Sequence, residues 1–263
     1  MPLTLKSVPA ASGALWVRDG FKLFARRPLA FTSLFVIFLL VAMLVSLVPV
    51  AGALVQMMSL PLLSLGFMVA AQSALLGGEV KPTQFIEPLR GEAARRDALV
   101  KMCVIYGVSA LAILLLCDAL SDEALLRLQK LLAKEGTTRD ELDALLAEPG
   151  VAWAAITAVV LGTALTVPFW HAPALVHWGG QSLGQALFSS TLAMWRNKGA
   201  FSVYTLVWIA VLFAFSIGAV MLLTLLGLLR LAGVLALPVG LALSAVFYVS
   251  LLFTFNDCFG NAG

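Results

Sequence analysis

Long runs of apolar residues, separated by short polar segments, dominate this chain. Six of the runs are close to the roughly 20 residues that a helix needs to cross the hydrocarbon of a membrane. They are almost free of charge, with Lys101 near the start of the third run as the exception. We therefore expect six membrane-spanning helices, over residues 29–48, 50–76, 98–117, 151–175, 201–229 and 231–256.

Shorter segments with a different pattern precede the spans. In the first, Ala14, Val17 and Phe21 recur at helical spacing and basic residues form an opposite stripe. An apolar face opposite basic residues is typical of a helix that lies in the headgroup layer. We expect Trp16 and Trp195 to act as interface anchors in two of these segments.

Three basic clusters suggest an internal repeat, because each cluster ends a short segment and a span follows at once. Arg26 and Arg95 are 69 residues apart, and the longer second interval returns to 69 once the extra loop 118–149 is removed. The chain is interpreted as three copies of one unit, a short interfacial helix followed by a transmembrane hairpin. The alternative is that topology alone places basic residues before such spans. The units cover residues 10–77, 78–180 and 181–263, and the clusters are Arg26, Arg27, Arg95, Arg96, Arg196 and Lys198.

The loop 118–149 carries its own helix signals. Ser121 is a helix start followed by acids, and Thr138 with Glu141 three residues later forms a capping box. Leucines recur on one face of each predicted helix. We expect two short helices that fold back on each other as a cap over the outer ends of the third and fourth spans, with a disordered polar loop as the alternative.

Composition supports a membrane protein. Hydrophobic residues make up 61% of the chain and charged residues 12%, against roughly 45–50% and about 25% in soluble domains. The net charge of +3 is too small to suggest a nucleic-acid partner. Cys103, Cys117 and Cys258 form no CxxC pair, so we expect no metal, no cofactor and no disulfide framework.

Basic residues indicate the orientation. With the N-terminus inside, twelve of the seventeen Lys and Arg residues lie in cytoplasmic segments and five in outer ones. Cytoplasmic loops carry an excess of Lys and Arg. We therefore expect a bacterial inner-membrane protein with both termini in the cytoplasm.

Several motifs resemble a known group of proteins. They are Val8-Pro9-Ala10 leading to Trp16, Gly66-Phe67-Met68 after Pro61, the loop from Pro82 to Arg90, Ala172-Pro173-Ala174-Leu175-Val176, and Phe247-Tyr248 with Asp257-Cys258-Phe259. Over nearly the whole chain, the sequence resembles a family of six-span bacterial inner-membrane proteins whose activity is not established. More loosely, its architecture is similar to membrane domains associated with glycerophosphodiester phosphodiesterases. No phosphodiesterase residues accompany that likeness.

Few polar residues offer chemistry. His171 and His177 are six residues apart, about 240° around a helix, so they cannot bind one ion together. Either is a proton-handling or ligand site, or a polar residue at the lipid–water boundary. Asp257 is expected to pair with an Arg of a basic cluster, to be solvated, or to act chemically. Gln56 and Gln72 are the main deep polar groups, and they either join helices or line a cavity at the proline breaks.

The sequence thus predicts an all-α membrane bundle of six transmembrane helices in three hairpins, each preceded by a short interfacial helix. We favour a non-catalytic protein that organises lipid or partner proteins, with anionic membrane lipids as the expected partner and a membrane-protein partner or homo-oligomer left open. A permease or small-solute channel is the alternative. A lipid-modifying enzyme comes third, because no catalytic constellation is present.

Overall fold

The computed structural model describes residues 3–48, 51–121, 127–128, 130–131, 134 and 138–260. Within these residues every regular element is helical and no strand occurs. Six helices are long and apolar enough to cross a membrane, as predicted. They are α2 (Pro28–Ser46), α3 (Ala51–Leu75), α4 (Ala93–Leu120), α7 (Pro149–Phe169), α10 (Lys198–Leu225) and α11 (Ala232–Phe259).

Shorter elements connect these helices. The helical ones are α1 (Ser12–Arg26), α6 (Arg139–Leu146), α8 (Ala172–His177) and α9 (Leu183–Arg196). Single 3-10 turns are η1 (Pro82–Phe85), η2 (Glu87–Arg90) and η3 (Leu229–Leu231).

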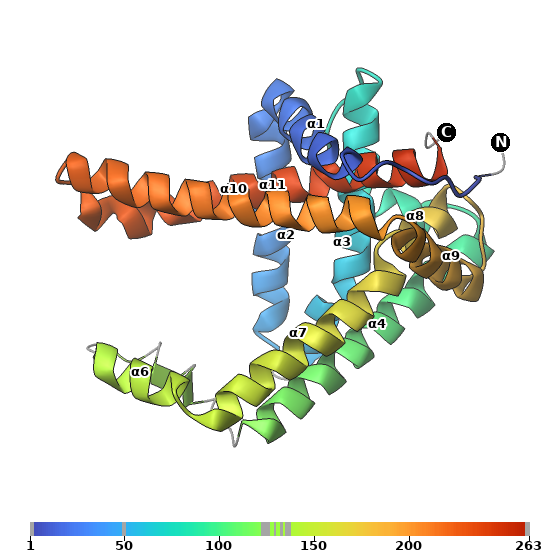
Figure 1. The fold of residues 1–263 in the computed structure, drawn as a ribbon. Coiled ribbons are helices and arrows are strands. Elements are labelled where there is room, and N and C mark those ends of the chain that lie inside the picture. Colours follow the sequence, from blue (N-terminus) through green and yellow to red (C-terminus); the bar gives the residue numbers. More distant parts are fainter. Residues whose placement is uncertain are drawn as a thin grey trace.

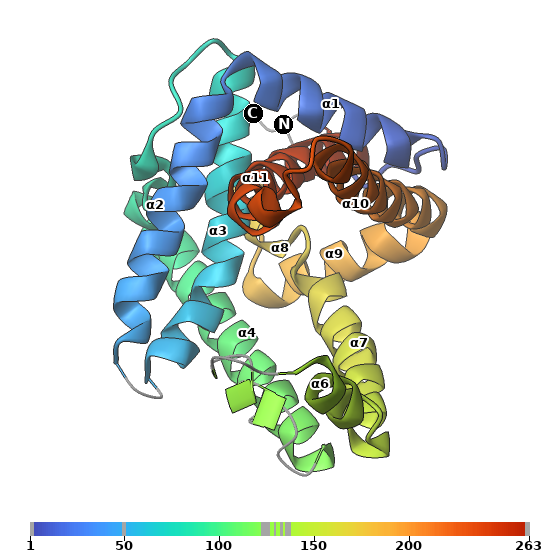
Figure 2. The same cartoon turned by 90° about the vertical axis from the view of Figure 1, so that its left-hand side faces the viewer.

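The long helices form three hairpins, α2–α3, α4–α7 and α10–α11, that diverge from a common base (Figures 1 and 2). The N-terminal segment, α1, α8, α9 and the last turns of α11 gather at that base, which we call the termini end (Figure 1). The opposite ends, where each hairpin reverses, are the turn ends. Helices α1, α8 and α9 therefore lie together on one side of the bundle, whereas α6 and η3 lie at the turn ends (Figure 1).

Helix α1 packs against α10 and α11 and lies across them (Figure 2). Two glycines allow the close approach. A Cβ on Gly13 would lie 2.1 Å from the carbonyl oxygen of Ala200, and one on Gly20 would lie 2.7 Å from the Cβ of Ser250. Trp16 lies between them and is only 1% exposed, so its prediction as an interface anchor is wrong. The apolar face of α1 is covered by protein, because Gly13 and Gly20 have no side chain and let α1 lie directly against α10 and α11.

Proline residues begin and break the helices. Pro28 and Pro149 stand in the first turns of α2 and α7, where a missing backbone N–H costs no helical hydrogen bond. Pro168 lies inside α7, which ends one residue later, and α8 begins after a short break. This break carries Trp170 and His171 into the protein interior.

The second hairpin lacks the short helix that was predicted to precede it. Residues 82–90 form the two 3-10 turns η1 and η2, because Pro82 and Pro88 interrupt the segment. Arg95 and Arg96 consequently lie in the first turn of α4 itself. The boundaries of the three repeats remain a prediction.

The loop 118–149 contains one of its two expected helices within the described residues. Thr138 Oγ1 accepts from the Glu141 amide at 3.3 Å, and Glu141 Oε2 accepts from the Thr138 amide at 3.1 Å. This confirms the capping box that begins α6. The other predicted helix falls largely outside the described residues. Helix α6 lies at the turn ends of α4 and α7 and contacts α7 (Figures 1 and 2). The two-helix cap over those ends stays a prediction, because its other helix lies largely outside the described residues.

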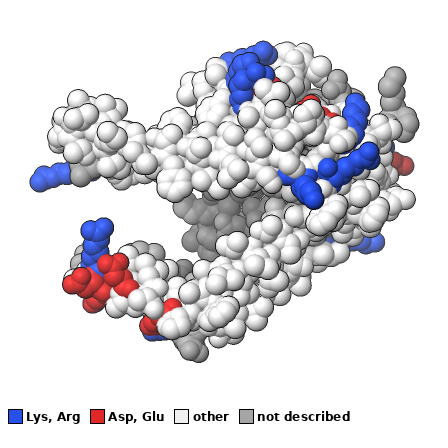
Figure 3. All heavy atoms as spheres, viewed as in Figure 1, with Lys and Arg blue, Asp and Glu red and all other residues white. Residues whose placement is uncertain are grey.

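The surface matches a membrane environment. Large apolar side chains remain exposed along the outer faces of the spans, including Leu206, Ile209, Leu212 and Phe213 on α10. Figure 3 shows a broad uncharged area on this face, with most of the visible Lys and Arg near the termini end and an acidic group at α6. Hydrocarbon is the environment in which such a surface is stable.

Candidate functional site

A cavity of about 1030 Å³ opens at the termini end of the bundle. The N-terminal segment, the last turns of α3, η2, the start of α4, α8 and the end of α11 form its walls. The residues that line it combine charged, polar and apolar groups. They are Leu3, Thr4, Lys6, Val69, Gln72, Ser73, Leu76, Glu87, Arg95, His177, Trp178, Phe259 and Gly260.

Arg95 connects two walls of this cavity. Its Nη1 donates to the carbonyl oxygen of His177 at 3.4 Å, joining α4 to α8. Its Nε lies 3.7 Å from a carboxylate oxygen of Glu92, and both side chains are exposed. An exposed ion pair of this kind contributes little to stability. The guanidinium therefore has donors left for another acceptor.

Lys6 reaches the cavity from a segment without helical structure, and three hydrogen bonds hold that segment in place. The Lys6 amide donates to the Cys258 carbonyl at 2.8 Å. Asn197 donates to the Lys6 carbonyl at 3.1 Å and accepts from the Val8 amide at 2.9 Å. Asn197 is 2% exposed, so this amide is a buried support for the N-terminal segment. Sequence reasoning missed it, although it stands between two residues of the third basic cluster.

The charges in the cavity are unequal. Lys6 and Arg95 are cations, and Glu87 is the carboxylate among the lining residues. Gln72 and Ser73 add neutral hydrogen-bonding groups, while the remaining wall is largely apolar. An amphiphile with an anionic head fits such a surface, because arginine and lysine bind phosphate oxygens and apolar groups cover a chain.

Arg95 also lines a second, adjoining hollow of about 780 Å³ between the start of α4 and residues 180–184. Lys101 contributes a further cation there, on the same wall as the acids Glu92 and Asp97 at the start of α4. The side chain of Arg95 thus stands between two openings at the termini end. This position distinguishes it from the other residues of the basic clusters.

Those other residues do not converge on one site. Arg27 donates to the carbonyl oxygens of Gly77 and Gly78 at the end of α3. Arg96 lies 3.4 Å from Asp97, and the ammonium of Lys198 lies 5.4 Å from the centre of the Trp195 ring. Arg26 and Arg196 are exposed. Of the six predicted headgroup contacts, only Arg95 lines the cavity.

One interpretation placed His171 at the lipid–water boundary, and the structure contradicts it. His171 is completely buried, because the break after α7 turns it inward. Its Nε2 lies 3.0 Å from Thr254 Oγ1, and its backbone amide donates to Ser190 Oγ at 3.0 Å. Within the described residues Nδ1 has no hydrogen-bond partner. The ring is enclosed by Phe201, Phe255 and Phe259.

Asp257 also has a different partner from the expected arginine. Its Oδ2 accepts a hydrogen bond of 2.7 Å from the indole nitrogen of Trp16. The bond joins α1 to the last turns of α11, so Asp257 supports the fold. Trp16 can donate to Asp257 because its ring is buried where α1 packs against α11.

Gln56 and Gln72 do not share a cavity. Gln56 is exposed on α3 near the turn end, whereas Gln72 lines the cavity at the termini end together with His177. They are sixteen residues apart on one helix, which is about 24 Å along its axis. A continuous polar path lined by both glutamines, the sign expected of a permease, is absent from the described part of the chain.

Metal ligands do not cluster in the described ranges, where no group of three His, Cys, Asp or Glu side chains is placed to hold an ion. The three cysteines are buried and unpaired. The cavity at the termini end, with Lys6 and Arg95, is therefore the candidate site.

Comparison with known proteins agrees with this architecture. No protein-family profile matches the chain, and no solved structure matches it. A probable inner membrane protein of Burkholderia thailandensis is 37% identical over 260 residues, which cover 98% of this chain and 94% of that protein. Since identity at this level extends over almost the full length of both sequences, the chain belongs to the same family of inner membrane proteins as its Burkholderia relative.

Proposed function

We propose that this protein is a non-catalytic, lipid-organising protein of the inner membrane that binds anionic lipid in the cavity at its termini end. The observation that carries the proposal is the pairing of Lys6 and Arg95 with an apolar wall inside one cavity of about 1030 Å³. The phosphate of a lipid would contact the two cations. Its acyl chain would lie along Leu3, Val69 and Leu76.

The proposal includes the orientation. Twelve basic residues belong to segments at the termini end, and five belong to the turn ends. Cytoplasmic segments of membrane proteins carry an excess of Lys and Arg, so this distribution supports a cytoplasmic position for the termini end. This leaflet is rich in anionic lipid, and each basic residue near it contributes about 1 kcal/mol of attraction.

Helix α9 gives further support, because it retains an exposed apolar stripe beside the site. Phe188, Leu192 and Trp195 are spaced four and three residues apart, so they share one helix face. Their exposed fractions are 69%, 41% and 73%. Lys198 lies next to Trp195. An apolar stripe with a bordering cation suits a helix lying at the membrane surface.

The proposal is tested by purifying the full-length protein from bacterial membranes in mild detergent and identifying retained lipids by native mass spectrometry. We expect phosphatidylglycerol or cardiolipin to be enriched over phosphatidylethanolamine. Arg95→Gln should weaken retention about fivefold, as expected for the loss of about 1 kcal/mol of attraction.

The adjacent Arg96→Gln is the matched control. It removes the same charge one residue away, from a side chain that pairs with Asp97 and does not line the cavity. Equal retention of anionic lipid by the wild-type protein and Arg95→Gln would contradict the proposed site. Equal loss in both variants would show a general charge effect and would also contradict it.

A further inference from the structure

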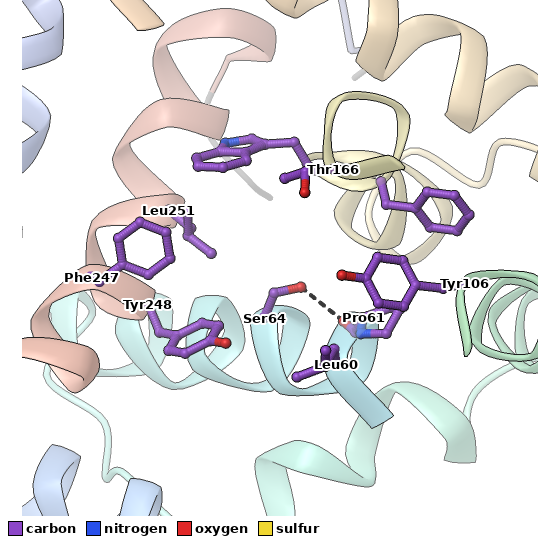
Figure 4. A pocket seen from close by; sticks show the side chains of 10 residues that line it. Leu60, Pro61, Ser64, Tyr106, Thr166, Phe247, Tyr248 and Leu251 are labelled. Carbon is purple, nitrogen blue, oxygen red and sulfur yellow. Dashed lines mark hydrogen bonds between the residues drawn. The ribbon is translucent and has the colours of Figure 1, made fainter. Parts of the chain in front are cut away.

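A third pocket lies between α3, α4, α7 and α11, and it shares no lining residue with the cavity of Lys6 and Arg95 or with the hollow beside it. Its volume is about 140 Å³. Figure 4 shows side chains from all four helices facing it. It is lined by Leu60, Pro61, Ser64, Tyr106, Thr166, Phe169, Trp170, Phe247, Tyr248 and Leu251.

Two tyrosine hydroxyls distinguish this pocket from an apolar packing defect. Tyr106 on α4 and Tyr248 on α11 direct their hydroxyls toward the same space (Figure 4). Within the described residues, no hydrogen bond to either phenol oxygen is present. In hydrocarbon an unpaired polar group is costly, because no water is there to replace the missing partner.

The neighbouring hydroxyls are already paired. Ser64 donates to the Pro61 carbonyl at 2.9 Å, and Thr166 donates to the Gly162 carbonyl at 2.7 Å. Tyr204, the remaining tyrosine of the chain, lies outside the pocket and 2.7 Å from Ser250 Oγ. The two pocket tyrosines are thus the donors available to a ligand.

The pocket has the size and walls of a site for a ring. Five of its ten lining residues are aromatic. Tyr106 and Phe169 are 5.1 Å apart between ring centres, and Phe247 and Tyr248 are 5.5 Å apart. A cavity of roughly 150 Å³ accommodates benzene. The aromatic faces and edges favour a planar ring over a flexible chain.

The pocket is open to the exterior of the protein. Leu60, Tyr106 and Thr166 are half-buried, so the pocket is not sealed by protein. The hairpins α4–α7 and α10–α11, which both contribute residues to the pocket, diverge toward their turn ends (Figure 1). A membrane-soluble molecule can therefore enter laterally.

We propose that this pocket binds the ring of a membrane quinone, with the hydroxyls of Tyr106 and Tyr248 donating hydrogen bonds to its carbonyl oxygens. A quinone combines a planar ring, carbonyl acceptors and an apolar tail. It satisfies both phenols without introducing a charge into the membrane. The inference is independent of the anionic-lipid site, because none of its residues lines that cavity.

The test uses the full-length protein in lipid nanodiscs titrated with decylubiquinone. Trp170 lines the pocket, so bound quinone should quench its fluorescence saturably, and Trp170→Phe should remove that component. Two further probes separate the parts of the ligand. Decylbenzene has the ring without carbonyls and methyl decanoate has a carbonyl without the ring, so both should compete at least tenfold more weakly.

Three isosteric variants test the hydroxyls. Tyr106→Phe and Tyr248→Phe should each raise the Kd for decylubiquinone about fivefold, as expected for one lost hydrogen bond. Tyr204→Phe, which removes a hydroxyl elsewhere in the core, should leave the Kd unchanged. Monodisperse elution and unchanged far-ultraviolet circular dichroism establish that each variant is folded.

Three outcomes would overturn the proposal. They are quenching that does not saturate, equal competition by decylbenzene or methyl decanoate, and an equal Kd for the wild-type protein and both pocket variants. If a pocket variant does not fold, the wild-type protein is cross-linked with a photoreactive quinone and the labelled residues are identified. Cross-links in α3, α4, α7 or α11 near the pocket support the site, and cross-links confined to α2 or the outer half of α10 overturn it.

Discussion

The indole nitrogen of Trp16 donates a 2.7 Å hydrogen bond to Oδ2 of Asp257, across a separation of 241 residues. It fixes the start of the chain to the last turns of α11. Around it, the Trp16 ring packs on Phe201 and Tyr204 at centre distances of 5.2 and 6.0 Å. The same region positions the N-terminal segment, which carries Lys6 to the cavity. The support of the fold and the construction of the candidate site are therefore linked.

Removal of that donor should destabilise the protein. Trp16→Phe leaves a ring in the core but takes the hydrogen bond from Asp257, which we expect to lower the free energy of unfolding by about 1–3 kcal/mol. Thermal unfolding in detergent measures the effect. Trp195→Phe is the control, because Trp195 is 73% exposed. Equal melting temperatures for the two variants would contradict the structural role of Trp16.

Close packing of α1 on α10 should tolerate no side chain at residue 13. Gly13→Ala would place a Cβ 2.1 Å from the Ala200 carbonyl oxygen and 2.6 Å from the Tyr204 amide nitrogen. Both are backbone atoms, so the helices must separate, at an expected cost of about 1–3 kcal/mol. Gly218→Ala is the control, since a Cβ there meets nothing within 4 Å. A melting temperature unchanged by Gly13→Ala would show that α1 is packed less closely.

The sequence was most informative where the signal is local. Apolar length predicts the six spans, and the spacing of Thr138 and Glu141 predicts the start of α6. Partners distant in sequence could not be predicted. The amphipathic pattern of α1 suits either lipid or protein, and only the three-dimensional fit of Gly13 and Gly20 decides that Trp16 is buried.

The same limit applies to the candidate site. Arg95 was singled out with five other basic residues of similar pattern, and its contact with His177, 82 residues away, is what distinguishes it. Lys6 lies in a segment without periodicity. The position of that segment depends on the buried amide of Asn197. Neither relationship has a signature in the residues around it.

Acid should loosen the start of α6. The hydrogen bond from the Thr138 amide, and the nearby charge of Lys134, hold the pKa of Glu141 below its ordinary value. The stabilisation is complete above the ordinary pKa of about 4.3 and is lost as the pH falls through the lowered value. Carbon chemical shifts of residues 139–146 should thus report less helix near pH 3 than at pH 7.

Glu141→Gln provides the matched comparison for that titration, because a glutamine can form the capping box without a titrating carboxyl. Its helix content should change less between the two pH values. The same pH dependence in the wild-type protein and Glu141→Gln would contradict the assignment to this residue.

The proposed orientation can be measured with single added cysteines, since the three native ones are buried. Asp140→Cys is exposed at a turn end and Arg18→Cys is exposed near the termini end. In cells with a permeable outer membrane, an impermeant maleimide should label Asp140→Cys. It should label Arg18→Cys only after the inner membrane is opened. The reverse pattern would overturn the topology.

The central claim, that an anionic lipid occupies the cavity at the termini end, is tested most directly by locating the lipid. Phosphatidylglycerol with a photoreactive headgroup is incorporated into nanodiscs with the wild-type protein, and cross-linked peptides are identified by mass spectrometry. Our account predicts labels concentrated on residues 3–6, 87–95 and 177–178, and competition by unlabelled phosphatidylglycerol more than by phosphatidylethanolamine. Labels distributed evenly over the exposed ends of the helices, with no such competition, would contradict it.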